Sequence, residues 1–93
     1  MPTEDSQTIV NRFFEALDLL KAAGRIGGKK TFTDRYGINR WNLNTLQKEP
    51  QRDIFQAAWL AYLVRDFGVS AQWLLTGTGE PLNETAKKKK ILH

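Results

Sequence analysis

The chain has 93 residues, no cysteine and a formal net charge of +4 at pH 7. This length fits one small domain, and the lack of cysteine excludes disulfides and thiolate-bound zinc. The only histidine, His93, is the last residue, so the sequence offers almost no residues for histidine-based catalysis or for a histidine-bound metal. We therefore expect a protein that is not an enzyme and that needs no cofactor and no metal.

The patterns of membrane and secreted proteins are also missing. The longest apolar run, residues 57–64, has eight residues, whereas a membrane-spanning helix needs about 20. The first residues, MPTEDSQ, are acidic and polar and are unlike a secretory signal. We expect a soluble cytoplasmic protein with no membrane partner.

The first predicted helix spans residues 8–23. Either Ser6 or Thr8 can cap its start, and Gly24 suits its end. The helix is indicated by apolar side chains that recur at helical spacing, at Ile9, Phe13, Phe14, Leu17 and Leu20.

A second, short helix is predicted over Lys29–Tyr36, after a flexible GRIGG segment in which Ile26 turns inward. Thr31, with Asp34 three residues later, offers an alternative capped start for this helix. Gly37 permits the left-handed backbone that ends the helix and turns the chain sharply.

The third predicted helix begins after Asn39, which is a good N-cap. Ile38 and Leu43 form a hydrophobic staple around that cap, and Pro50 ends the helix near Lys48 because it disfavours helical geometry at the residue before it. Two short helices joined by a tight glycine turn predict a helix-turn-helix, whose second helix reads the major groove of DNA.

A fourth helix is predicted over residues 53–67, with Asp53 as its cap. Its apolar residues cover much of its circumference, so it should be central or share a second face with a partner chain. A short fifth helix starts at Ser70, with Val69 and Leu74 as a staple pair. Trp59 of the fourth helix and Trp73 of the fifth are expected in the core.

No strand signal competes with these five helices. The predicted fold class is therefore all-α, a five-helix bundle containing a helix-turn-helix. The predicted organisation is a disordered N-terminus, the DNA-binding domain and a basic disordered tail, at residues 1–5, 6–82 and 83–93.

Positive charge is concentrated in two places. Residues 25–52 carry seven basic and two acidic side chains, and Lys87–Lys90 add four more lysines. This distribution favours a surface that binds phosphate groups, although the lysine run alone is equally well explained as a solvated segment.

The region from Asn11 to Pro81 resembles the lambda-repressor-like domains of phage repressors and the xenobiotic-response-element (XRE) helix-turn-helix family. The resemblance depends on the spacing of Phe32, Tyr36, Gly37, Ile38, Leu43 and Leu46, and on the segment FGVSAQWLLTGTGEP, residues 67–81. It implies a five-helix fold that binds operator DNA, usually as a dimer, and regulates transcription. Trp41 and the loop KEPQRD after the third helix depart from the family pattern.

At about 100° per residue, Leu43 and Leu46 fix the inward face of the third helix. The residues on its outer face and first turn are then the candidates for reading bases, namely Arg40, Trp41, Asn42, Asn44 and Thr45. Arg suits guanine, Asn suits adenine, and an aromatic ring or a Thr methyl suits the thymine methyl. The candidates for phosphate contact are Lys29, Lys30, Thr31, Asn39, Lys48 and Arg52.

Each candidate also has a simpler interpretation, such as a solvated charge for Arg40 or a core or dimer contact for Trp41. The predicted function is sequence-specific binding of double-stranded DNA by a homodimeric transcriptional repressor of phage or mobile-element type, associated with the nucleoid. The alternative is an interaction module that acts on a protein partner, such as the antitoxin half of a toxin–antitoxin pair.

Overall fold

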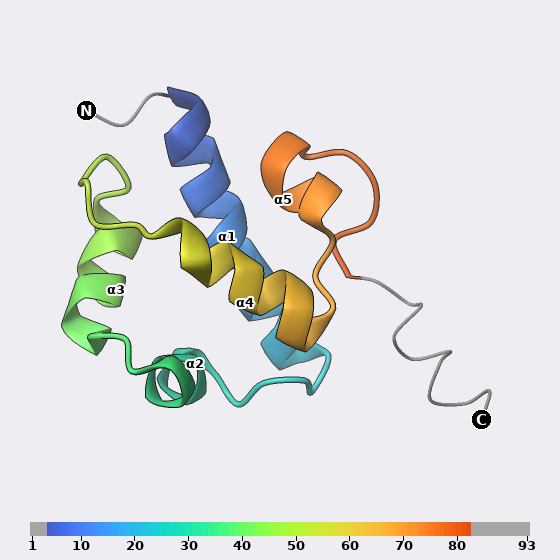
Figure 1. The fold of residues 1–93 in the computed structure, drawn as a ribbon, viewed down its shortest axis with the longest axis horizontal. Helices are drawn as coiled ribbons and strands as arrows, with labels where there is room; N and C mark the ends of the chain where they lie inside the picture. The colour runs from blue at the N-terminus through green and yellow to red at the C-terminus, as the bar shows by residue number, and fades with distance from the viewer. Residues whose placement is uncertain (1–3, 83–93) are drawn as a thin grey trace.

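A computed structural model describes residues 4–82 as five α-helices and contains no strand within that range (Figure 1). The helices are α1 (Glu4–Ala22), α2 (Lys29–Tyr36), α3 (Arg40–Lys48), α4 (Ala57–Phe67) and α5 (Ala71–Thr76). The predicted all-α class is thus confirmed for this part of the chain. The predicted tail, residues 83–93, and the first three residues lie outside the described residues.

Helix α1 is the element against which the other helices assemble. It contacts α3, α4 and α5, while α2 contacts α3 and α4 contacts α5. In Figure 1, α4 crosses in front of α1, with α2 and α3 on one side and α5 on the other. The α2–α3 pair therefore lies at one edge of the molecule.

The centre of the core is an aromatic cluster around Phe13 of α1. Its ring is fully buried and contacts four other rings, those of Phe14, Phe32, Phe55 and Trp59, at centroid separations of 5.1–5.9 Å. Such ring pairs add about 0.5–1.5 kcal/mol each beyond the burial of apolar area. This cluster joins α1 to α2 and α4 and so fixes where the α2–α3 pair sits.

The predicted start of the first helix was wrong. Helix α1 already includes Glu4 and Asp5, so neither Ser6 nor Thr8 caps it; Thr8 instead donates its hydroxyl to the carbonyl of Glu4 within the helix. Residues 4 and 5 are therefore not part of a disordered N-terminus. Helix α2 begins at Lys29, as predicted, and not at the alternative start capped by Thr31.

Helix α4 begins three residues later than predicted. Its N-cap is Gln56 in extended backbone, and Asp53 lies in the preceding turn. The apolar side chain of Phe55 suggested a longer helix, but its ring packs edge-on against Phe13 and Trp59 from outside the helix. A core contact made from a loop has the same apolar signature in sequence as one made from a helix.

The other predicted helix ends are confirmed. Gly37 and Gly68 adopt left-handed backbone just after α2 and α4. The side chain of Ser70 caps α5 by accepting a hydrogen bond from the amide of Trp73, while Val69 and Leu74 are buried on either side of that cap.

Candidate nucleic-acid interface

The inner face of α3 is anchored by two leucines. Leu43 and Leu46 are both 0% exposed and belong to the core. At the start of the helix, the side chain of Asn39 accepts a hydrogen bond of 3.0 Å from the amide of Asn42. Because core and cap fix the helix about its axis, the side chains opposite the leucines must face outward.

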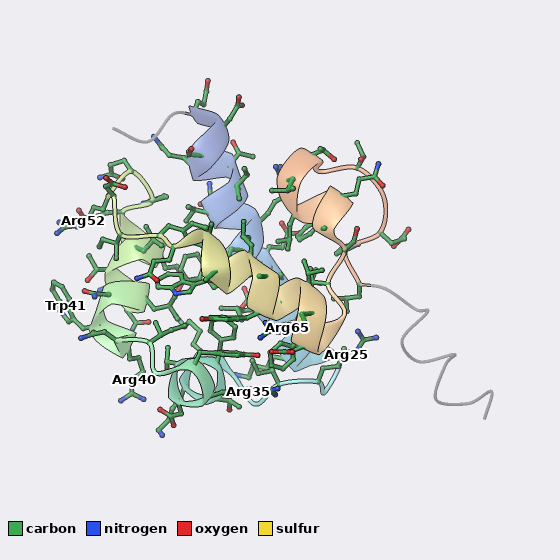
Figure 2. The ribbon with its side chains drawn as sticks, in the orientation of Figure 1. Arg25, Arg35, Arg40, Trp41, Arg52 and Arg65 are labelled. Carbon is green, nitrogen blue, oxygen red and sulfur yellow. The ribbon has the colours of Figure 1, made fainter. Side chains whose placement is uncertain are left out.

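The outward face of α3 is polar and cationic, with one large apolar residue. Trp41 is 67% exposed, and Asn44 and Lys48 are also exposed, whereas Thr45 is half-buried. Arg40 lies on the flank of the first turn and is exposed. Figure 2 shows Arg40 and Trp41 pointing away from the body of the protein at its outer edge.

These outward side chains make no hydrogen bond and no ion pair elsewhere in residues 4–82, and the ring of Trp41 makes no aromatic contact there. The hydrogen bond from Lys30, and after it the nearby charge of Arg40, nevertheless lower the pKa of the Asp34 carboxyl group. Helix α3, RWNLNTLQK, contains no carboxylate. The face therefore offers hydrogen-bond donors and positive charge, and the nearby carboxylate that acts on Arg40 is that of Asp34 on α2.

The first turn of α2 brings further donors beside α3. Gly28 precedes this turn and provides no side-chain cap, so amides of the first turn lack a side-chain acceptor. Lys29 donates from Nζ to Oε1 of Gln47 on α3, which ties the start of α2 to the end of α3. Thr31 is exposed.

Two of the cationic candidates are held in exposed ion pairs. Lys30 lies 2.7 Å from Asp34, and Arg52 lies 3.4 Å from Glu49. Exposed pairs of this kind contribute about 0–1 kcal/mol. A phosphate group can therefore compete for either side chain at little cost in free energy.

Asn42 is placed differently from the other base-reading candidates. It is half-buried on the flank of α3 that faces α4, where it lines a pocket of about 230 Å³ together with Asn39, Gln56, Trp59 and Tyr62. The outward face and this flank are separated by about a quarter turn of helix. Asn42 is thus apart from the group formed by Trp41, Asn44 and Lys48.

The positive charge of residues 25–52 is less concentrated than the sequence suggested. Arg25 donates to the carbonyl of Phe67 at the end of α4. Arg35 lies 3.8 Å from the carboxylate of Asp66, with its guanidinium over the ring of Phe67. Both arginines therefore serve contacts to α4 and are not part of the outward face of α3.

A hydrogen-bonded cluster joins α2 to α4 behind this face. The hydroxyl of Tyr36 donates to Asp66, and the Tyr36 ring stacks on that of Tyr62 at 4.0 Å. Burial and the Asp66 contact raise the pKa of Tyr36 to about 12. The hydrogen bonds from Arg65 and Tyr36 hold the pKa of Asp66 well below its usual range. The cluster keeps α2 in place at neutral pH.

Sequence reasoning missed the structural roles of two side chains. Arg12 of α1 donates to the carbonyls of Leu74 and Leu75 at the end of α5, over 2.7 and 3.0 Å, and Gln47 accepts from Lys29. Neither role has a local signal in the sequence, because Arg12 lies 62 residues from Leu74 and Lys29 lies 18 residues from Gln47.

Comparisons with models of protein families, with curated proteins and with solved structures found no match to this chain. Within residues 4–82, no helix is both long enough and apolar enough to cross a lipid bilayer.

Proposed function

We propose that this protein binds double-stranded DNA in a sequence-specific manner, with α2 and α3 forming a helix-turn-helix and α3 lying in the major groove. The observation that carries the proposal is the outward face of α3. Leu43 and Leu46 on the opposite side are fully buried, whereas the outward Trp41, Asn44 and Lys48 make no hydrogen bond, ion pair or ring contact within the described chain. A groove-reading helix needs this division between an anchored face and a free polar face.

The roles of individual residues follow from their chemistry. Arg40 and Asn44 can each make two hydrogen bonds to one base, Arg40 to guanine and Asn44 to adenine. Thr45, half-buried, is in a position to contact a base edge at the margin of the face. Lys48, together with the first turn of α2, provides contacts to phosphates, which position the helix without reading sequence.

We further propose that the protein acts as a homodimer and as a transcriptional repressor. One reading helix covers only a few base pairs, so two half-sites about 34 Å apart are expected to be bound together. The surface available to a second copy includes the exposed Ala57 and Ala61 of α4 and Leu75 of α5, which is 52% exposed. A DNA-binding repressor of this kind would act at the nucleoid in the cytoplasm.

The same side of α4 favours a second candidate function. A groove of about 350 Å³ lies between α1 and α4, with Ile9, Val10, Phe55 and Leu60 among its lining residues. In this alternative the groove holds a different protein, as in the antitoxin half of a toxin–antitoxin pair. Such a complex co-purifies with its partner at a fixed ratio, and the isolated chain then binds DNA weakly or not at all.

Fluorescence anisotropy with duplexes selected from a randomised pool tests the main proposal. We expect the logarithm of the binding constant to fall with the logarithm of salt concentration, with a slope of about 0.9 per phosphate contacted. Arg40→Ala should lose about 1–3 kcal/mol for the selected duplex and little for a scrambled one. Lys21→Ala, which removes an exposed charge from the end of α1, is the matched control. Equal losses in both variants contradict the proposal.

A further inference from the structure

Trp41 is the most exposed large apolar side chain of the described residues. It is 67% exposed, whereas Trp59 and Trp73 are 4% and 7% exposed. The indole makes no ring contact and no hydrogen bond within residues 4–82. An indole left in water forgoes the stabilisation that burying an aromatic side chain gives, so its place on α3 calls for a partner outside this part of the chain.

The surroundings of the indole indicate what kind of partner this is. Asn44 and Lys48 share its face, and Arg40 lies on the adjacent flank. An apolar protein surface would have to bury these amide and cationic groups without partners, which is costly. The edges of base pairs instead offer acceptors to the amide and the cations, and phosphates accept from Lys48.

Base-pair edges in the major groove carry one apolar group, the C5-methyl of thymine. The C5-methyl of a methylated cytosine occupies the same position on the pyrimidine ring. An indole pointing outward from a helix in the groove has no other apolar group to contact on the bases. The ring of Trp41 is therefore matched chemically to a pyrimidine that bears a 5-methyl group.

We propose that Trp41 packs on the 5-methyl group of a pyrimidine, so that the affinity of the protein for DNA depends on the presence of that methyl. This inference rests on the proposed function, because it takes α3 to lie in the major groove. The feature of the DNA site that Trp41 selects is then the 5-methyl group. This selection also makes binding sensitive to cytosine methylation wherever a cytosine stands at that position.

The test replaces each thymine of a selected duplex, one at a time, with deoxyuridine, which lacks only the methyl group. At one position in each half-site we expect affinity to fall about fourfold, the effect of losing one buried methyl. In Trp41→Ala the same replacement should change affinity by less than about 1.5-fold. In a second duplex series with cytosine at that position, 5-methylation should strengthen wild-type binding about fourfold and leave Trp41→Ala unchanged.

Folding of the variant does not confound this result, since Trp41 is exposed and alanine favours helix; circular dichroism checks it. If the wild type binds duplex DNA but no uracil position depends on Trp41, the inference is overturned while the proposed function stands. Tighter binding to the single strand than to the duplex also overturns it, because the indole would then be stacking on unpaired bases. If the wild type binds no DNA, the proposed function fails and the inference with it.

Discussion

At the scale of single residues, Gly37 sets the direction in which α3 leaves α2. Its φ is +66°, and its amide donates to the carbonyl of Thr33. A Cβ added there would meet no atom within 4 Å. Any cost of a side chain at this position therefore comes from backbone conformation alone and not from a clash.

We predict that Gly37→Ala lowers the free energy of unfolding by about 1 kcal/mol, because left-handed backbone is unfavourable for a residue with a Cβ. Gly37→Asn should lose less, since Asn tolerates this conformation better than Ala. Urea unfolding followed by circular dichroism measures both. If Ala and Asn were equally tolerated, the left-handed turn would not be present in solution.

Tyr36 makes the stability of the protein depend on pH in the alkaline range. Because its folded pKa is raised from about 10 to about 12, the neutral phenol is favoured in the folded state. Its contribution is fully present below pH 10 and is lost as the pH rises from 10 to 12. We predict that the free energy of unfolding of the wild type decreases between pH 10 and 12. In Tyr36→Phe the decrease caused by ionisation of Tyr36 should be absent.

Urea unfolding at several pH values between 9 and 12, for the wild type and for Tyr36→Phe, measures this difference. Absorbance of the tyrosinate ion near 295 nm reports the titration directly. Parallel stability profiles for the two proteins would mean that the hydroxyl of Tyr36 does not donate to Asp66 in solution.

At the scale of elements, α5 depends on an arginine from α1. It has only six residues, which is too short to be stable alone. Arg12 donates to two carbonyls at its end, where helix carbonyls lack partners of their own. The buried Trp73 and Leu74 provide the remaining anchor.

We predict that Arg12→Ala lowers the free energy of unfolding by about 1.5–3 kcal/mol, the range for hydrogen bonds that involve a charged group. Amide hydrogen exchange should accelerate most in α5. Lys21→Ala, also on α1 but exposed, should change stability by less than about 0.5 kcal/mol. A uniform change in exchange across all helices would contradict a specific link between Arg12 and α5.

Elements whose ends carry local chemistry could be predicted from the sequence. Gly37 indicated the end of α2 correctly, and Asn39 and Ser70 indicated the starts of α3 and α5. The start of α4 could not be predicted, because Phe55 packs on Phe13 from extended chain and no local pattern reports that contact. Likewise, the sequence placed Arg25 and Arg35 in a cationic segment and gave no sign of their distant partners, Phe67 and Asp66.

At the scale of the whole molecule, the surface proposed for DNA and the groove meet at Arg52, which lies in the loop between α3 and α4. The outward face of α3 lies at one edge, and Figure 2 shows Arg52 at the same outer side as Arg40 and Trp41. The groove between α1 and α4 is lined in part by Arg52, whereas the exposed Leu75 lies on α5. This arrangement leaves room for DNA at α3 and for a second protein chain at the exposed Leu75 of α5.

The central claim is that the outward face of α3 contacts DNA, and an NMR titration of ¹⁵N-labelled protein with a selected duplex tests it most directly. We predict the largest shift changes at the indole N–H of Trp41, the side-chain amide of Asn44 and the backbone amides that begin α2. Signals from α5 should change little at low DNA ratios. Changes concentrated on α4 and α5, or no changes at saturating duplex, would contradict the account.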